Sequence, residues 1–463
     1  MQFVNVRKLT RGMDDYGEIP PESSIIKSTI HMAWPAVLES FFVNLSGVLN
    51  TIMVSGLGTY AIAAVGLTQQ PRFLGLCIFF SLNVAVSAIV ARRKGENDRD
   101  SANRIMRMAL MITVGLTALI SVLMVVFASP IIRLVGSQPD THEYAVEYFQ
   151  IAMGGSVFTT ISLVINAAQR GCGNTRIAMV TNLTSNIVNV FFNYLLIGGN
   201  LGFPAMGVRG AATATVIGTV FGCFLSIKSL MKKDGFLYLG AVKGFIADKK
   251  STLSMLNVGS SAFVEQLCMR IGFLLFSMTV ARLGTQQLAA HQIGMNMMSM
   301  SFSFGDGLSV AVVTLIGQSL GRKRPDMAKI YGNVSQKIGF ICSCFVSTIY
   351  FFFGKQLYGL FSSDPEILDY GVMIMRILAV VLFLQIEQVV CLGCLRGAGD
   401  TRYTAMVSLI SVTVIRSGAS WLFCYPLGLG LLGVWLGTTC DQIVRALLSY
   451  VRFRKGKWTR LKL

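Results

Sequence analysis

Apolar stretches long enough to cross a bilayer recur from one end of this 463-residue chain to the other. A helix needs about 18 to 20 apolar residues to span the hydrocarbon core. No water satisfies the backbone there, so continuous runs of this length form helices rather than the short alternating strands of a barrel. Only 13% of the residues are charged, whereas a soluble domain carries about 25%. The sequence therefore predicts an all-α integral membrane protein.

About twelve transmembrane helices are predicted from the length of these runs. Several runs exceed a minimal span, which indicates tilted or bent helices. The predicted centres lie near Phe41, Phe79, Thr117, Thr159, Val188, Ile217, Leu274, Phe302, Cys344, Leu384, Val414 and Leu436.

The net charge of +18 is distributed according to this topology. With the N-terminus inside, the inner segments hold roughly thirty Lys and Arg and the outer loops about four, which is a strong positive-inside signal. The pattern predicts a multi-pass protein of the plasma membrane with both termini in the cytoplasm. It also favours contact of the basic segments with anionic lipid headgroups, and it argues against nucleic acid as a partner.

The chain contains an internal duplication. A shift of 226 positions places Glu39 on Glu265 and repeats the turn "AQRGCGNTR", Ala168–Arg176, as "CLRGAGDTR", Cys394–Arg402. Each half holds six spans, so both halves begin and end on the cytoplasmic side. Two pseudo-symmetric six-helix bundles around a central cleft are typical of alternating access.

The duplication also defines the predicted domains. They are an N-terminal cytoplasmic arm (1–27), an N-lobe (28–230), a basic cytoplasmic linker (231–250), a C-lobe (251–452) and a basic cytoplasmic tail (453–463).

The duplicated turn joins the fourth span to the fifth in each half. Its glycines allow a tight reversal with positive φ, and its Asn or Asp with Thr can cap the following helix. The flanking arginines can meet headgroup phosphates. A phosphate-binding loop would need a preceding strand and a Gly-Lys-Ser/Thr ending, and neither is present. We interpret the motif as a structural turn between two helices.

In their order and spacing, the two turns, the segments "AVGL" and "AAHQIGMN" and the segment "GQSLG" resemble the multidrug and toxic compound extrusion (MATE) family. The resemblance extends from about Ile30 to Tyr450. It implies a secondary transporter, not an enzyme, that exports organic, often cationic, small molecules in exchange for Na+ or H+. It implies no cofactor besides the coupling ion and no obligate protein partner, and a monomer suffices because one chain carries both halves.

The resemblance identifies candidate coupling residues in the N-terminal half. Family members commonly have an Asp in the first span before "T-x-M-V/A-G-x-L-G", and the matching segment "NTIMVSGLG" has Asn50 there. An Asn does not exchange protons, although its carbonyl can be a ligand of Na+. In the fifth span, Asn189 and Asn193 are four residues apart and share a helix face.

Ionisable residues inside spans are costly, about 2.5–3.5 kcal/mol on insertion scales, and are functional candidates by default. Glu265 and its repeat partner Glu39 are candidates for cation coupling. The alternative for Glu265 is a structural ion pair, with Arg270 as the suggested partner.

The later spans contain further acids. Asp306 and Glu387 are additional coupling candidates. Asp441 and Arg445, four residues apart, are predicted to form an ion pair on one helix face. Arg416 has no partner that the sequence identifies.

A broad-specificity cleft needs adaptable apolar walls with a few polar groups, and Met and aromatic side chains provide such walls. For each apolar side chain, ordinary burial remains the alternative. The candidate cleft residues are Gln292, Met295, Asn296, Phe302, Gln385 and Gln388.

Three other functions fit the sequence less well. A flippase for a lipid-linked or polysaccharide precursor would share the two-bundle plan but is expected to have a basic cleft for a pyrophosphate. An integral-membrane enzyme is disfavoured because the three His residues show no HxxxD or HExxH spacing and no GxSxG motif lies in a span. A channel is disfavoured because no filter-like repeat is present.

Overall fold

The computed structural model describes residues 16–232, 235–240, 249–362 and 364–461. These residues form helices joined by turns, with no strand among them, so the all-α prediction is confirmed. The first half contains α2 (Glu22–Ser55), α3 (Thr59–Gly95), α4 (Arg99–Val126), α5 (Ala128–Leu134), α6 (Pro139–Gly154), α7 (Ser156–Gly171), α8 (Thr175–Gly198), the 3-10 turn η1 (Asn200–Gly202) and α9 (Gly207–Ser229). The second half contains α10 (Lys249–Ala281), α11 (Thr285–Gly321), α12 (Pro325–Gly359), α13 (Pro365–Gly397), α14 (Thr401–Ser408), the π-helix η2 (Leu409–Arg416), α15 (Ser417–Cys424), α16 (Gly430–Lys455) and the 3-10 turn η3 (Lys457–Arg460).

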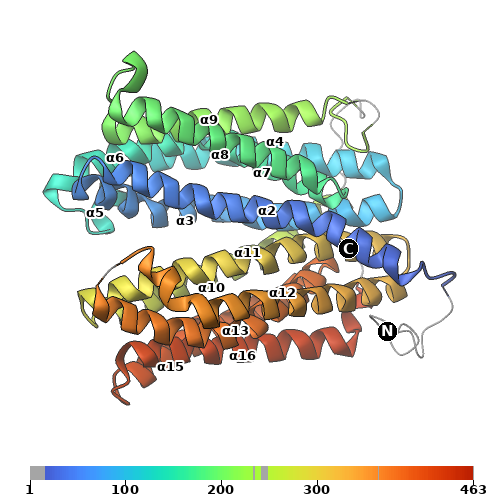
Figure 1. Ribbon diagram of the computed structural model, residues 1–463. Helices are drawn as coiled ribbons and strands as arrows, with labels where there is room; N and C mark the ends of the chain where they lie inside the picture. Colours follow the sequence, from blue (N-terminus) through green and yellow to red (C-terminus); the bar gives the residue numbers. More distant parts are fainter. Residues whose placement is uncertain (1–15, 233–234, 241–248, 363, 462–463) are drawn as a thin grey trace. The chain divides into compact units, whose positions relative to one another are not determined.

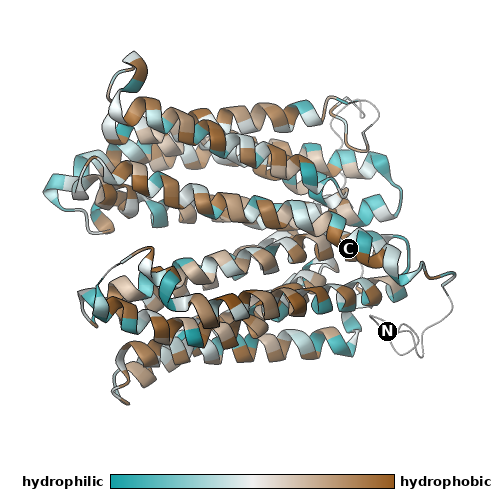
Figure 2. Ribbon diagram, in the orientation of Figure 1, coloured by the Kyte–Doolittle hydropathy of each residue, from teal (hydrophilic) through white to brown (hydrophobic). Residues whose placement is uncertain are grey.

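All twelve predicted centres lie within helical segments. In the described part of the chain, ten spans are long and apolar enough to cross a membrane, and α6 with α7 forms an eleventh that is bent by 46°. The remaining predicted span is α8, a 24-residue helix that carries four asparagines and is therefore less apolar. Hydrophobic residues cover most of the length of the helices, and hydrophilic residues gather near their ends (Figure 2).

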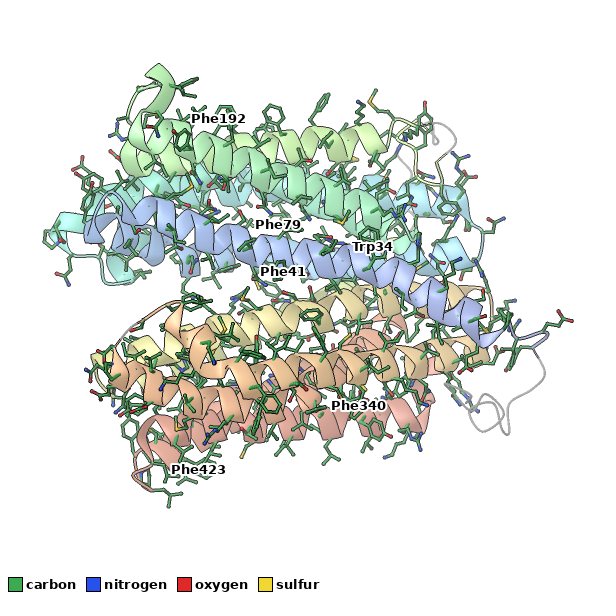
Figure 3. The ribbon with its side chains drawn as sticks, viewed as in Figure 1. Trp34, Phe41, Phe79, Phe192, Phe340 and Phe423 are labelled. Carbon is green, nitrogen blue, oxygen red and sulfur yellow. The ribbon has the colours of Figure 1, made fainter. Side chains whose placement is uncertain are left out.

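The helices divide into two compact units, which we call the N-lobe unit (Leu38–Leu256) and the C-lobe unit (Met1–Val37 with Asn257–Leu463). The two units meet in the sequence within α2 and within α10, ten residues after the predicted boundary at 27/28 and six residues after the predicted boundary at 250/251. Figure 3 labels Trp34 and Phe41 on α2, and the boundary lies between them.

Contacts near the two boundaries explain this division. Ile25 of α2 is buried against Met327, Ile330 and Val334 of α12. The start of α10 joins the N-lobe unit, where the Thr252 hydroxyl lies 3.2 Å from the Met108 sulfur. The predicted arm and linker lie partly outside the described residues, and the last six residues of the predicted arm are already the start of α2.

The predicted basic tail begins as an ordered extension of α16. Trp458 in η3 is fully buried, its ring stacks on Phe453 with 5.4 Å between centroids, and its Nε1 donates to the Phe453 carbonyl at 2.9 Å. The final two residues lie outside the described part.

One face of α12 is exposed and strongly apolar. In the C-lobe unit, Phe340 of α12, labelled in Figure 3, is 58% exposed. On the same helix Ile341, Phe345, Phe351, Phe352 and Phe353 are also exposed. A soluble protein rarely exposes so continuous an apolar face, so this face is suited to contact lipid.

Equivalent glycines shape the duplicated turn in both halves. Gly173 and Gly399 have φ values of 92° and 86°, a region that a side chain disfavours, so the predicted positive-φ reversal is confirmed. Gly171 and Gly397 allow close helix packing, since a Cβ there would lie 2.7 Å from the carbonyl oxygens of Ser87 and Val313 respectively. Those two partners are themselves repeat-related.

The predicted capping role of this turn is wrong. Asn174 and Asp400 occupy the N-cap positions of α8 and α14 but make no side-chain cap hydrogen bond. Each side chain has a different partner. Asn174 Nδ2 donates to Gln169 Oε1 at 3.1 Å, and Arg452 Nε donates to Asp400 Oδ2 at 2.8 Å.

The close approach at Gly397 gives a stability prediction. Gly397→Ala is expected to lower the free energy of unfolding by about 1–3 kcal/mol, because backbone atoms must move to accept the new methyl group. Gly418→Ala is the matched control, since a Cβ there meets nothing within 4 Å. Thermal unfolding of the purified protein in detergent compares the two variants, and equal midpoints would contradict the packing role.

Candidate functional site

The N-lobe unit contains a cavity of about 370 Å³. Helices α2, α3, α6, α8 and α9 contribute to its wall, and all of its lining residues belong to this unit. Figure 1 shows these helices running alongside one another in the first half of the chain. The polar side chains of the wall are Asn50, Thr51, Gln69, Arg72, Tyr148, Asn193 and Thr215.

Close packing of α8 and α9 brings polar groups together beside this cavity. A Cβ at Gly218 of α9 would lie 2.5 Å from the Ser185 carbonyl oxygen of α8, so only glycine permits this approach. As a result Asn189 Nδ2 reaches the Thr215 hydroxyl at 3.2 Å.

The three predicted asparagines of this half form one hydrogen-bonded group. Asn193 Nδ2 donates to Asn50 Oδ1 at 2.7 Å and lies 3.4 Å from Asn189 Oδ1. Asn193 is 2% exposed, and its own Oδ1 has no hydrogen-bond partner among the described residues. A buried acceptor without a donor costs about 1–3 kcal/mol, so this oxygen is suited to a ligand that supplies a donor or a cation.

Arg72 of α3 is a functional candidate that our sequence analysis missed. Its Nη1 lies 3.3 Å from the Tyr148 hydroxyl, and its guanidinium carbon lies 5.7 Å from the centre of that ring. No carboxylate of the described residues forms an ion pair with it, and the cavity wall includes no acid. An ionisable residue inside the apolar run around "TQQPRFLG" was the available signal.

Glu39 pairs with the duplicated turn of its own half. Arg170 Nη2 donates to Glu39 Oε1, and Asn182 Nδ2 donates to the same oxygen at 2.5 Å. The carboxylate is 7% exposed, and its Oε2 has no hydrogen-bond partner among the described residues. One guanidinium therefore neutralises the buried charge.

Glu265 has the equivalent arrangement in the C-lobe unit. Arg396 Nη2 donates to Glu265 Oε1, and the Thr404 and Ser408 hydroxyls donate to this carboxylate at 2.8 and 3.3 Å. Ser408 is the repeat partner of Asn182. The ion pair that the sequence suggested with Arg270 is formed with Arg396 instead. The first arginine of each turn, Arg170 or Arg396, therefore pairs with a carboxylate rather than serving only as a contact for lipid headgroups.

The other predicted residues of the C-lobe unit are dispersed over α11 and α13. Gln385 and Gln388 are buried; Gln385 Nε2 lies 3.4 Å from the Met298 carbonyl, and neither polar side-chain atom of Gln388 has a partner among the described residues. Asp306 and Glu387 are half-buried. On α11, Gln292, Asn296 and Phe302 are exposed, whereas Met295 packs against the buried cluster around Phe276.

A buried ionic cluster links the last helices of the C-lobe unit. The predicted pair is confirmed, with 2.9 Å between Arg445 Nη2 and Asp441 Oδ1. Arg416, which the sequence left without a partner, approaches the same carboxylate at 2.6 Å. Its guanidinium also lies over the rings of Phe273 and Phe276. All three charged side chains are buried, so the cluster holds one net positive charge inside the unit.

Among the described residues, no group of three or more His, Cys, Asp and Glu side chains is arranged to hold a metal ion.

Comparisons with known proteins agree with the duplicated fold. The sequence profile of the MatE family matches twice, over residues 35–195 and 261–422. The two matches begin 226 residues apart, which is the offset of the internal repeat.

Two curated relatives align over most of the chain. "Probable multidrug resistance protein NorM" of Thermotoga maritima is 29% identical over 453 residues, covering 95% of this chain and 94% of the relative. "Uncharacterized transporter YisQ" of Bacillus subtilis is 25% identical over 433 residues, covering 93% and 94%.

The fold is also similar to solved structures. One is described as the outward-facing conformation of a multidrug resistance MATE family transporter of the MOP superfamily. It has a TM-score of 0.87, 23% identity and 98% coverage of each chain. A likeness at this identity shows the fold, whereas the profile matches cover more than half of the chain. The chain therefore belongs to the MatE family of multidrug efflux transporters, and it is a multi-pass, ion-coupled membrane antiporter of small molecules rather than an enzyme.

Proposed function

We propose that this protein exports organic small molecules across the plasma membrane in exchange for Na+ or H+, by alternating access. Both termini lie in the cytoplasm in this proposal, as the positive-inside charge distribution favours. The observation that carries the proposal is a polar cavity inside one lobe of a duplicated MatE-type chain.

Glu387 is the acid that we assign first to ion coupling. Among the described residues it forms no recorded ion pair or hydrogen bond, and it is half-buried in α13. A carboxylate inside a span without a counter-charge can bind and release a proton or Na+ in the course of transport. Asp306, also half-buried, is the second candidate on the C-lobe side.

The coupling roles predicted for Glu39 and Glu265 would require an existing ion pair to break. Each carboxylate is already neutralised by a turn arginine, so a cation must displace that arginine in order to bind. Asn50, Asn189 and Asn193 remain candidate Na+ ligands through their carbonyl oxygens. The positive charge of Arg72 in the same cavity opposes such a cation.

The charge of the substrate determines the choice of probes. The sequence favours cationic compounds, with Gln292, Met295, Asn296, Phe302, Gln385 and Gln388 as candidate contacts. The positively charged wall of the N-lobe cavity favours the opposite sign, so the assay must include probes of both charges.

The decisive experiment is transport in proteoliposomes under an imposed Na+ or pH gradient. The wild-type protein is expected to move at least one fluorescent organic ion with one of the two gradients. Glu387→Gln is expected to lower the gradient-driven rate about tenfold or more, which corresponds to about 1.4 kcal/mol. Glu366→Gln, at an exposed position on the same helix, is the control. Equal rates in the two variants would remove Glu387 from coupling.

A flippase for a lipid-linked or polysaccharide precursor is the second candidate. It was expected to have a basic cleft, and Arg72 provides one basic group in the N-lobe cavity. Gradient-independent movement of a fluorescent lipid-linked pyrophosphate across the same vesicles, with no movement of organic ions, would favour it over the exporter.

A further inference from the structure

We propose that the N-lobe cavity is selective for organic anions that also carry a hydrogen-bond donor, with Arg72 binding the anionic group. The proposal rests on the exporter function and specifies its substrate class.

The charge of the cavity wall is the first argument. Arg72 is its one charged lining residue, and a guanidinium stays protonated in proteins. An organic cation would meet this charge without any lining carboxylate to offset it. An anion would instead receive charge-assisted hydrogen bonds, which are stronger than neutral ones.

The position of the guanidinium is the second argument. The Tyr148 hydroxyl, 3.3 Å from Nη1, and the Tyr148 ring hold Arg72 against α6. A guanidinium has five N–H donors in a rigid fork, so this contact leaves donors for a carboxylate in the bidentate geometry that Arg favours.

The unpaired acceptor in the wall is the third argument. Asn193 directs its amide N–H groups to Asn50 and Asn189, and its buried Oδ1 is left without a donor. A hydroxyl or amide N–H on the ligand would satisfy this oxygen. Val54, Ile62 and Val65 add apolar surface for an organic body.

Comparison of the two halves is the fourth argument. Residues that build the fold are repeated, as the pairs Glu39–Arg170 and Glu265–Arg396 show. Three polar residues of the cavity wall are not repeated. The repeat positions of Asn50, Arg72 and Tyr148 are Phe276, Met298 and Ile374, three buried apolar side chains. The duplicated fold therefore does not require Arg72 at its position, which points to a role in binding.

The test compares three fluorescent probes with the same aromatic body. They are 6-hydroxy-2-naphthoate, 2-naphthoate without the hydroxyl, and a hydroxynaphthyl trimethylammonium cation. Equilibrium binding to the full-length purified protein in nanodiscs needs no ion gradient. The wild type is expected to bind the hydroxylated anion at least about tenfold more tightly than the cation, the scale of one hydrogen bond to a charged group. Tighter binding of the cation would overturn the proposal without any mutant.

Variants then assign the effect to named groups. Arg72→Gln is expected to weaken anion binding about 10- to 100-fold, Arg72→Lys to retain part of it, and the exposed control Arg133→Gln to leave it unchanged. Asn50→Asp is expected to shift the preference toward the cation. Asn193→Leu is expected to remove the advantage of the hydroxylated anion over 2-naphthoate. Unchanged anion binding by Arg72→Gln would contradict the assignment.

Transport of the same probes in proteoliposomes separates the two proposals. If the cation is exported and the anions are not, the exporter function stands and the anion selectivity fails. If no probe moves with either gradient while the anion binds through Arg72, the selectivity stands and the exporter function fails.

Discussion

Replacing Asp441 with Asn is expected to lower the free energy of unfolding by about 3–5 kcal/mol. Asp441 is fully buried between Arg416 and Arg445, which are 1% and 6% exposed. Its carboxylate is within 3 Å of both guanidinium groups. The neutral amide would leave two buried positive charges without a counter-charge, which costs far more than the loss of an exposed ion pair.

Thermal unfolding of the purified protein in detergent measures this loss. Asp369→Asn, at an exposed position on α13, is the matched control and is expected to leave the midpoint nearly unchanged. Adding Arg416→Met to Asp441→Asn removes one of the stranded charges and is expected to restore part of the stability. If Asp441→Asn unfolds at the temperature of its control, the cluster does not stabilise the C-lobe unit.

Only part of this ionic cluster could be predicted from the sequence. Asp441 and Arg445 could be paired from the sequence because four residues make one turn of the same helix. Arg416 could not, because its approach depends on how η2 packs against α16. The positions of the helices followed from hydropathy alone, since each span must satisfy its own backbone hydrogen bonds.

The two duplicated ion pairs could have been predicted from the sequence. In both halves the glutamate and the turn arginine are separated by 131 residues, and both members recur at the same offset. Two charged residues that are duplicated together inside apolar helices are natural partners, because each neutralises the other. Arg72 has no duplicate, so only its presence in an apolar run could have drawn attention to it.

Mutants of the Glu265–Arg396 pair are expected to distinguish a structural role from ion coupling. The single variants Glu265→Gln and Arg396→Gln each leave one charge of the pair without its partner and are expected to lose about 2–4 kcal/mol of stability. The double variant is expected to lose less than the sum, with a coupling energy of about 1–3 kcal/mol. Thermal unfolding of the four proteins completes the cycle, and additive losses would mean that the two side chains do not interact.

Transport by the same four proteins decides the function of Glu265. If the carboxylate exchanges the coupling ion, Glu265→Gln and the double variant both lose gradient-driven export, whereas Arg396→Gln retains it. If the pair only fixes the turn between α13 and α14 to α10, the two single variants lose export alike and the double variant recovers part of it. We expect the second pattern, because Arg396 together with the Thr404 and Ser408 hydroxyls already satisfies both carboxylate oxygens. A cation could bind there only by displacing Arg396, a half-buried charge partner whose equivalent, Arg170, forms the same ion pair in the other half of the chain.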